Sequence, residues 1–208
     1  MLTTNNIITQ KHARVFITGD IEKANEIWLL FHGYAQNAEE FFEPFQSFAK
    51  DKCFIIPEGL SRFYQKGIFG KVGASWMTSE ERELEILDQV YYLNQVFKHY
   101  NLDSKTLNVF AFSQGAMTAA RWIQNSKIKI NRLVFWSGNI PDEIASNKES
   151  WVNQQSPEFF VGKNDQFASI ETWKKFFNKT PFYKPIFHDG NHFFTNQELN
   201  NFIFNSIH

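Results

Sequence analysis

Short apolar runs of β-branched and aromatic residues recur along this chain, separated by longer amphipathic segments. Residues 27–31, for example, read Ile-Trp-Leu-Leu-Phe. A run that is apolar at every position is typical of a strand buried on both faces of a sheet. Because such runs alternate with helical segments, we predict an α/β fold with a mostly parallel central sheet and helices on both faces. Ligands bind such sheets at the carboxyl ends of the strands.

The expected elements follow from these runs and from the helical spacing between them. We predict strands at residues 14–18, 27–31, 53–56, 107–112, 132–136, 158–161 and 183–187. We predict helices at residues 38–50, 79–100, 114–125, 170–178 and 196–207. Residues 58–77 and 138–157 look irregular and follow strand ends, so we expect long loops there, of the kind that is usually functional or mobile.

The longest predicted helix begins with an acidic segment. Thr78, followed three residues later by Glu81, fits a capping box at its start. Carboxylates in a first helical turn complement the helix dipole, and those further along face solvent. We therefore interpret the acidic cluster as part of a helix start rather than as a metal site. Its members are Glu80, Glu81, Glu83 and Glu85.

Length and composition restrict the class of protein. The 208 residues fit one domain over residues 1–208, and the net charge of −1 argues against a nucleic-acid-binding protein, which needs a basic surplus. The single cysteine, Cys53, excludes an intramolecular disulfide, and its apolar neighbours indicate a buried, inert thiol. No apolar run is long enough for a membrane span and no signal-peptide pattern is visible, so we expect a cytoplasmic protein.

Ser113 stands at a strand-to-helix junction, in the sequence Val-Phe-Ala-Phe-Ser-Gln-Gly-Ala of residues 109–116. A sharp turn of this kind exposes the serine hydroxyl and requires small residues two positions before and after it. Gly115 meets that requirement, whereas Ala111 carries a methyl group where the G-x-S-x-G form has glycine. The alternative is a serine that only caps the following helix. The two roles are compatible, because a helix N-terminus also stabilises an oxyanion.

A second candidate segment is His32-Gly33-Tyr34, which also follows an apolar strand. Gly33 allows a tight turn, so that the backbone amides of Tyr34 and Gln114 can form an oxyanion hole. His32 is an alternative general base. We favour a structural role for it, because the chain order expected for this arrangement is serine, acid, histidine.

Asp165 and His192 complete the candidate site. Asp165 follows a predicted strand and a glycine, in Gly162-Lys163-Asn164-Asp165, where an Asx turn or helix cap is the structural alternative. His192 lies in a polar loop after the last predicted strand, where an imidazole can accept and return a proton. His188 ranks second as the base, and Asp189 is too close to His192 in sequence to be the preferred partner. Ser113, Asp165 and His192 therefore form a candidate nucleophile, acid and base set.

These motifs together resemble the α/β-hydrolase superfamily, in particular the phospholipase/carboxylesterase group that includes acyl-protein thioesterases. Residues 111–115, Ala-Phe-Ser-Gln-Gly, resemble that group's G-F-S-Q-G, and residues 32–34 resemble its H-G-x oxyanion turn. Residues 162–165 resemble G-x-x-D, and residues 190–192 resemble G-x-H. The similarity extends from about residue 27 to the C-terminus. It implies a three-layer α/β-hydrolase fold with a sheet of eight strands or slightly fewer, a small lid rather than a large cap domain, and no cofactor.

The resemblance and the residues together predict a serine hydrolase of small to medium acyl or aryl esters. Trp76 stands near where that group has its acyl site, and the departure there is the lack of an aspartate after Ser75-Trp76-Met77. We predict that Trp76, Phe69 and Phe193 bind substrate, that the partner is a small-molecule ester, and that no metal takes part. A homodimer is a further expectation. Alternatives are a thioesterase or lysophospholipase on the same residues, or a non-catalytic binding protein.

Overall fold

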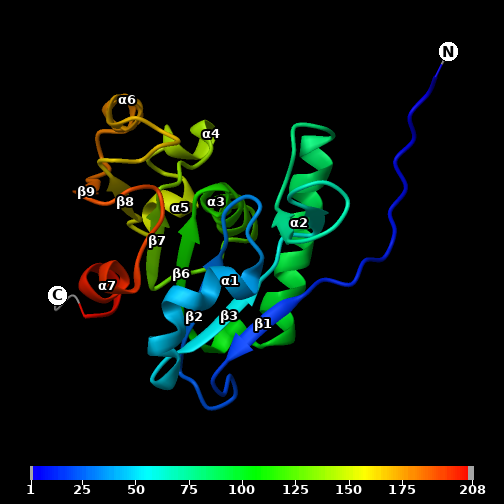
Figure 1. The fold of residues 1–208 in the computed structure, drawn as a ribbon, viewed down its shortest axis with the longest axis horizontal. Helices are drawn as coiled ribbons and strands as arrows, with labels where there is room; N and C mark the ends of the chain where they lie inside the picture. Colours follow the sequence, from blue (N-terminus) through cyan, green and yellow to red (C-terminus); the bar gives the residue numbers. More distant parts are fainter. Residues whose placement is uncertain (1, 206–208) are drawn as a thin grey trace.

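The computed structural model describes residues 2–205, and its centre is a seven-stranded sheet in the order β1-β3-β2-β6-β7-β8-β9 (Figure 1). Strand β1 pairs with β3 in antiparallel orientation, and every other neighbouring pair is parallel. The mostly parallel sheet predicted from the apolar runs is therefore confirmed. The strands are β1 (Val15–Thr18), β2 (Glu26–Phe31), β3 (Cys53–Pro57), β6 (Thr106–Phe112), β7 (Arg132–Trp136), β8 (Glu158–Gly162) and β9 (Ile186–His188).

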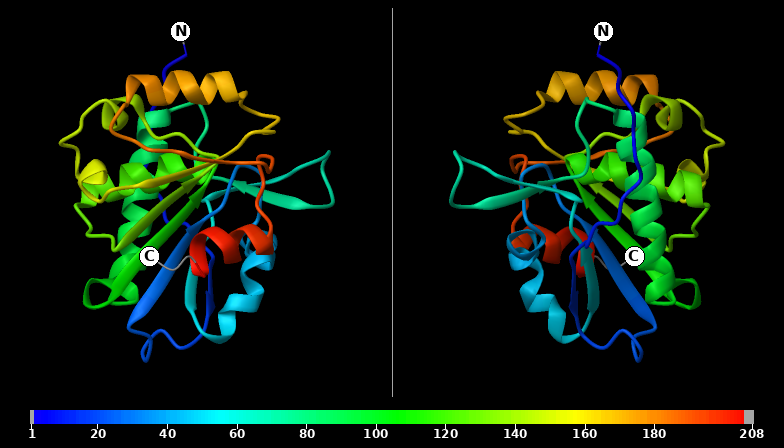
Figure 2. Two further views of the ribbon diagram at one scale, coloured as in Figure 1. Left: turned by 90° about the vertical axis from the view of Figure 1, so that its left-hand side faces the viewer. Right: turned by 90° about the vertical axis from the view of Figure 1, so that its right-hand side faces the viewer.

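Helices cover both faces of the sheet, which gives three layers (Figure 2). Side chains of β2 alternate between two hydrophobic clusters: Ile27 and Leu29 belong to one, Trp28 and Leu30 to the other. This is why the run is apolar throughout. The first cluster includes side chains from α2 (Arg82–His99), α3 (Gln114–Ser126), α5 (Trp151–Gln154) and α6 (Ile170–Lys179). The second includes side chains from α1 (Ala38–Phe42), the 3-10 helix at Glu43–Lys50, α7 (Asn196–Leu199) and the π-helical turn at Asn200–Phe204.

Several predicted element bounds need correction. The helix expected at residues 38–50 is α1 followed by a 3-10 helix, with Pro44 in the first turn of the second part. The last strand is β9 rather than residues 183–187, because Pro185 removes a ladder donor directly before it. The last helix divides into α7 and a π-helical turn, and the predicted end at residue 207 lies outside the described residues.

The capping box predicted at the start of the long helix is wrong. Helix α2 begins at Arg82, and Glu81 precedes it with a left-handed backbone (φ 45°) and no side-chain cap. Glu85 takes the expected role instead, since its carboxylate accepts hydrogen bonds from the amide and hydroxyl of Thr78. Glu85, in the first turn of α2, therefore fixes the loop that precedes the helix.

The loop predicted over residues 58–77 contains an antiparallel hairpin, formed by β4 (Ser61–Tyr64) and β5 (Val72–Ser75). Figure 2 shows this hairpin projecting from the body of the molecule. The C-terminal end of β5, called the hairpin foot below, is hydrogen-bonded to the segment after β2. Ala35 N donates to Ala74 O, and Ala74 N donates to Gln36 O. The second predicted loop, residues 138–157, contains the short helices α4 (Asp142–Ala145) and α5.

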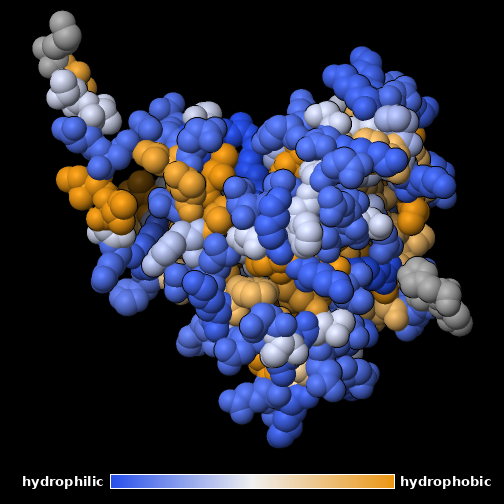
Figure 3. Space-filling view, turned by 180° about the vertical axis from the view of Figure 1, so that it is seen from behind, coloured by the Kyte–Doolittle hydropathy of each residue, from blue (hydrophilic) through white to orange (hydrophobic). Residues whose placement is uncertain are grey.

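The segment before β1 extends away from the body without regular structure (Figure 1). Seen from behind, the molecule is mostly hydrophilic, with hydrophobic side chains interspersed on the body and along this extension (Figure 3). Within residues 2–205, every helix is either too short or too polar to cross a bilayer. Cys53 is buried as predicted, and burial raises the pKa of its thiol.

Candidate active site

Ser113 occupies a sharp turn between β6 and α3. Its backbone has φ 51° and ψ −119°, a conformation that non-glycine residues rarely adopt. The turn is held in place because Ser113 N donates to Trp136 O at 3.0 Å, in the neighbouring strand β7. The strand-to-helix turn expected from the sequence is therefore present, with Ser113 directly before the first residue of α3.

Gly115 is small for a packing reason. A Cβ built there would lie 2.6 Å from the carbonyl oxygens of both Phe31 and His32, at the end of β2. The close approach brings the segment after β2 against the start of α3. Ala111, the other small position, is fully buried, so the fold accommodates the methyl group that replaces glycine there.

Ser113, His192 and Asp165 are joined by two hydrogen bonds. His192 Nε2 lies 3.0 Å from Ser113 Oγ, and His192 Nδ1 lies 2.8 Å from Asp165 Oδ2. The other carboxylate oxygen, Asp165 Oδ1, accepts from the amides of Phe167 and Ala168. Asp165 thus makes the local turn expected as its alternative role and also bonds to the imidazole. Because Oδ1 is occupied by two donors, Oδ2 is fixed toward His192.

The loops that carry Asp165 and His192 are fastened to each other. Lys163 N donates to His188 O at 2.8 Å, and Asn164 N donates to Gly190 O at 3.0 Å. A Cβ at Gly162 would lie 2.1 Å from Asn191 O, so only glycine permits this approach. These contacts fix the His192 loop relative to the Asp165 loop before any ligand binds.

Aromatic rings surround the His192 imidazole. Their centroids lie 5.0 Å away for Phe112, 4.7 Å for Phe167 and 5.5 Å for Phe193. Phe167 and Phe193 are 71% and 48% exposed, so they border the opening of the site. Phe167 was not predicted from the sequence, although an aromatic residue two positions after the candidate acid is a signal that was available.

The two backbone amides expected to hold an oxyanion come from the segment after β2 and from the first residue of α3. Within residues 2–205, the amides of Tyr34 and Gln114, the two donors expected for an oxyanion, make no hydrogen bond to a protein acceptor. The turn before Tyr34 is held by Gln36, whose Oε1 accepts from Gly33 N at 2.8 Å.

The Gln114 side chain links the start of α3 to the residues that follow β5, at the base of the hairpin. Its Oε1 accepts from Trp76 N at 3.1 Å, and its Nε2 donates to Met77 O at 2.9 Å. No sequence pattern indicates this positioning role, because the partners lie almost forty residues earlier in the chain.

The alternative residues have other partners. His32 is fully buried; its Nδ1 donates to Gly33 O and its Nε2 accepts from Gly59 N, so the ring is neutral and structural. Burial lowers the pKa of His32 to about 4. His188 packs on Trp136 and its Nδ1 lies 3.0 Å from Glu198, while Asp189 forms an exposed ion pair with Lys163. None of these side chains bonds to Ser113.

The predicted substrate-binding residues differ widely in exposure. Trp76 is fully buried, stacks on His32 and donates its indole N–H to His32 O, so its place is beneath the site rather than at its opening. Phe69 is 78% exposed and lies between β4 and β5 at the hairpin tip. Of these three residues, Phe193 is the one whose ring contacts the imidazole of His192.

A pocket of about 220 Å³ opens beside Ser113. It lies between the start of α3, the residues after β7 and helix α6. Its lining includes Met117, Ser137, Ala168, Trp173 and Phe176. None of the described residues that line it is charged.

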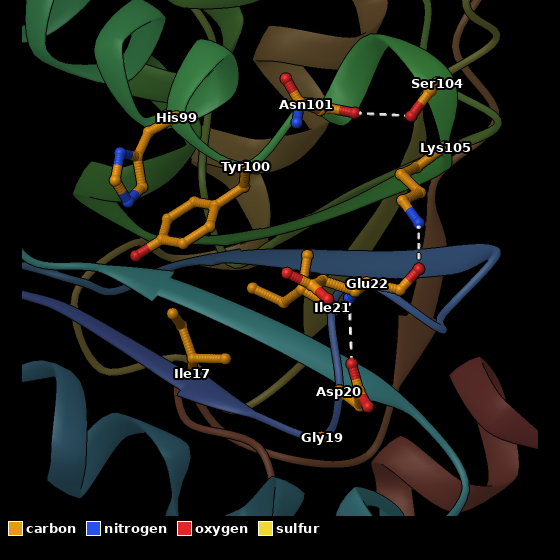
Figure 4. A pocket seen from close by; sticks show the side chains of 10 residues that line it. All are labelled: Ile17, Gly19, Asp20, Ile21, Glu22, His99, Tyr100, Asn101, Ser104 and Lys105. Carbon is orange, nitrogen blue, oxygen red and sulfur yellow. Dashed lines mark hydrogen bonds between the residues drawn. The ribbon is translucent and has the colours of Figure 1, made fainter.

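A larger cavity of about 790 Å³ lies at the opposite end of the sheet (Figure 4). It is bordered by Lys105, which precedes β6, whereas Ser113 follows that strand. The amino group of Lys105 is already used, donating to the carbonyls of Glu22 and Ala24. Within residues 2–205, no three His, Cys, Asp or Glu side chains are grouped so as to hold a metal ion.

Known structures share this fold. The crystal structure of esterase PE8 superposes with a TM-score of 0.64 at 16% identity, covering 90% of this chain and 94% of that one. The Bacillus cereus carboxylesterase gives 0.59 at 15% identity, covering 90% of each chain. A variant of Arabidopsis thaliana SOBER1 gives 0.59 at 15% identity, covering 85% of this chain and 94% of that one. No protein-family model and no curated protein matches the sequence. The chain thus has the α/β-hydrolase fold of these esterase structures.

Proposed function

We propose that this protein is a serine hydrolase that cleaves carboxylic esters of small to medium acyl or aryl groups through an acyl-enzyme on Ser113. The observation that carries the proposal is the pair of hydrogen bonds from Ser113 to His192 and from His192 to Asp165, at 3.0 and 2.8 Å. A serine hydroxyl is a weak nucleophile at neutral pH and requires a base of this kind. The fold, shared with esterase and carboxylesterase structures, supports the same reaction class.

The first half of the reaction forms the acyl-enzyme. Ser113 Oγ attacks the ester carbonyl carbon while His192 Nε2 accepts the hydroxyl proton. Asp165 orients the imidazole and stabilises the imidazolium that results. The negative charge on the carbonyl oxygen is stabilised by the amides of Tyr34 and Gln114, which are free to donate. The intermediate then collapses, and His192 gives its proton to the departing alkoxide.

The second half releases the acid. Water enters the place vacated by the alcohol and attacks the acyl carbonyl while His192 again accepts a proton. The same two amides stabilise the second oxyanion, and collapse returns the proton to Ser113 Oγ. Each residue therefore acts twice: one ester and one water are consumed, an alcohol and an acid are released, and the chain returns to its starting state.

Fluorophosphonate labelling tests this proposal directly. We expect wild-type protein to be labelled and Ser113→Ala to be unlabelled, with unchanged circular dichroism in the variant. Initial rates on p-nitrophenyl esters of increasing chain length then measure the preferred acyl size. A folded wild-type protein that neither labels nor hydrolyses any ester would overturn the proposal in favour of a non-catalytic binding protein.

Thioester and lysophospholipid hydrolysis use the same residues. A direct comparison of kcat/KM on an oxygen ester, a thioester and a lysophospholipid of equal acyl length separates these alternatives. One domain over residues 1–208, a cytoplasmic location and a homodimer stay predictions from the sequence. Light scattering after gel filtration decides the last of these.

A further inference from the structure

The carboxylate of Glu198 bridges the two ends of the His192 loop, residues 189–194. Its Oε1 lies 3.0 Å from Nδ1 of His188, the last residue of β9, directly before the loop. Its Oε2 accepts from Thr195 N at 2.8 Å and from the Thr195 hydroxyl at 2.9 Å, directly after the loop. The two oxygens of one side chain therefore bond to opposite ends of the loop that carries His192.

Helix capping explains only one of these two contacts. Thr195 and Glu198 form a capping box at the start of α7, in which the Thr195 hydroxyl also accepts from Glu198 N at 3.2 Å. Both donors of Thr195 bond to Oε2, so the cap leaves Oε1 free. The contact between Oε1 and His188 is thus additional to the cap, and it connects α7 to the end of the sheet.

The imidazole of His188 donates to this carboxylate. Burial lowers the pKa of His188, so the ring is neutral and carries one proton. A carboxylate only accepts, and His188 Nε2 has no hydrogen-bond partner among the described residues, so we assign the proton to Nδ1. A phenylalanine would pack on Trp136 without leaving a buried nitrogen unpaired. Packing alone therefore does not account for an imidazole at this position.

The backbone of Gly190 lies against the bonded pair. A Cβ at Gly190 would lie 2.4 Å from Glu198 Oε1 and 2.7 Å from His188 Nδ1. The carbonyl oxygen of Gly190 accepts from Asn164 N at 3.0 Å, which joins the His192 loop to the loop that carries Asp165. A shift of the pair would therefore displace the backbone two residues before His192, where it bonds to the Asp165 loop.

We propose that Glu198 and His188 are positioning residues, whose mutual hydrogen bond fixes the His192 loop so that the imidazole reaches Ser113 and Asp165 together. Both act through the backbone of the loop and not on the substrate. Catalytic geometry is sensitive to such support, because a displacement of about 1 Å lowers a rate about 10²-fold. The inference rests on the proposed ester hydrolysis and adds two residues on which that reaction depends.

Two variants remove the hydrogen bond from opposite ends. Glu198→Ala removes the acceptor, and His188→Phe removes the donor while keeping a ring against Trp136. Each should lower kcat on a p-nitrophenyl ester about tenfold to hundredfold and leave KM unchanged. The double variant should be no slower than the slower single variant, because both remove the same interaction. His188→Phe should retain the wild-type melting temperature, which separates the loss of rate from a loss of stability.

Two further variants serve as matched controls. Thr195→Val weakens the capping box but keeps the bond from Thr195 N to Glu198, so it should lower the melting temperature and leave kcat near the wild-type value. Glu198→Gln should restore most of kcat. Its oxygen can face Thr195, and its NH₂ can donate to His188 Nδ1 once the ring proton moves to Nε2. Wild-type kcat in His188→Phe, or equal losses in Thr195→Val and Glu198→Ala, would overturn the inference.

An NMR measurement keeps the inference separate from turnover. The low-field proton signal of the His192–Asp165 hydrogen bond, assigned by its loss in His192→Gln, reports the placement of the imidazole without a substrate. We expect Glu198→Ala and His188→Phe to broaden or lose this signal, and Thr195→Val and Glu198→Gln to retain it. If the wild type hydrolyses no ester, the proposed function fails, while this signal still decides the positioning role. An unchanged signal in Glu198→Ala or in His188→Phe contradicts that role.

Discussion

The two sides of Ser113 are built in different ways. On the imidazole side, residues 162–165 and 188–192, side chains make the hydrogen bonds that lead to Ser113, and two loops bond directly to each other. On the amide side, residues 32–36 and 73–77, the expected donors are backbone amides, held by the hairpin foot and by the Gln114 side chain. Side-chain chemistry depends on residue identity, whereas amide chemistry depends on conformation alone. Substitutions should therefore damage the two sides through different mechanisms.

The largest expected effect is on the imidazole side, in Asp165→Asn. Two backbone amides already donate to Oδ1, so the asparagine will place its carbonyl oxygen there and turn its NH₂ toward His192 Nδ1. Nδ1 must then accept, and the proton moves to Nε2, which can no longer accept from Ser113. We expect kcat to fall about 10⁴-fold. Steady-state kinetics on a p-nitrophenyl ester measure this, with the melting temperature as a check on folding. A loss below tenfold would rule out Asp165 as the orienting acid.

The next effect compares one glycine from each side. A Cβ at Gly162 would lie 2.1 Å from Asn191 O, and one at Gly73 would lie 2.2 Å from Ala35 O. Each alanine substitution therefore displaces one loop, and a displacement of about 1 Å lowers the rate about 10²-fold. The low-field proton NMR signal of the His192–Asp165 hydrogen bond separates them: Gly162→Ala should lose it, and Gly73→Ala should retain it.

Gly67→Ala is the control for that pair. A Cβ at Gly67 meets no atom within 4 Å, although its positive φ strains any alanine. It should lower stability slightly and leave kcat/KM unchanged. If Gly73→Ala also leaves kcat/KM unchanged, the amide side does not depend on the hairpin foot as the hydrogen bonds indicate.

The imidazole side was predictable from the sequence for a simple reason. Ser113, Asp165 and His192 each follow an apolar run, and in a parallel sheet the residues after the strands meet at one edge. His32 also follows such a run, and only the expected chain order placed it outside the reacting set. In the structure, both ring nitrogens of His32 are bonded to backbone groups, those of Gly33 and Gly59.

The amide side was much less predictable. The hairpin strands are four residues each and include Gly73, so they carry too little alternation to be distinguished from a loop. The Gln114 side chain finds its partners by tertiary contact, which no local pattern reports. Only the resemblance places Trp76 near the acyl site, and the hydrogen bond from its indole N–H to His32 O is a tertiary contact that no local pattern reports.

A third prediction concerns pH and the amide side. Burial lowers the pKa of His32 from 6.5 to about 4. Between these two pH values, His32 is protonated in the unfolded chain and neutral in the folded chain. The stabilisation from the neutral ring is complete above pH 6.5 and is lost as pH falls toward 4. It amounts to about 3 kcal/mol of unfolding free energy. Burial also lowers the pKa of His188, which adds loss of the same sign.

Urea unfolding at pH 7.5 and pH 4.5 measures this term in wild type and in His32→Gln. The variant is expected to be less stable at pH 7.5. Its free energy of unfolding should fall less on acidification, because it lacks the buried imidazole whose pKa is lowered. His192→Gln is the comparison from the imidazole side and retains the His32 contribution. Parallel pH profiles for wild type and His32→Gln would contradict the assignment of His32 as the buried neutral ring.

The smallest expected effect is that of Asp189→Asn, which sharpens the contrast with Asp165. Asp189 is three residues from His192, but its carboxylate is exposed and pairs with Lys163 at 2.7 Å. That ion pair lowers the pKa of Asp189, yet exposed pairs of this kind contribute little to stability. The loop keeps the hydrogen bond that the Asn164 side chain donates through Nδ2 to Asp189 O, which the substitution does not remove. We therefore expect kcat/KM to change less than about twofold at low or high salt. A loss comparable with that of Asp165→Asn would assign the orienting carboxylate to the histidine loop itself.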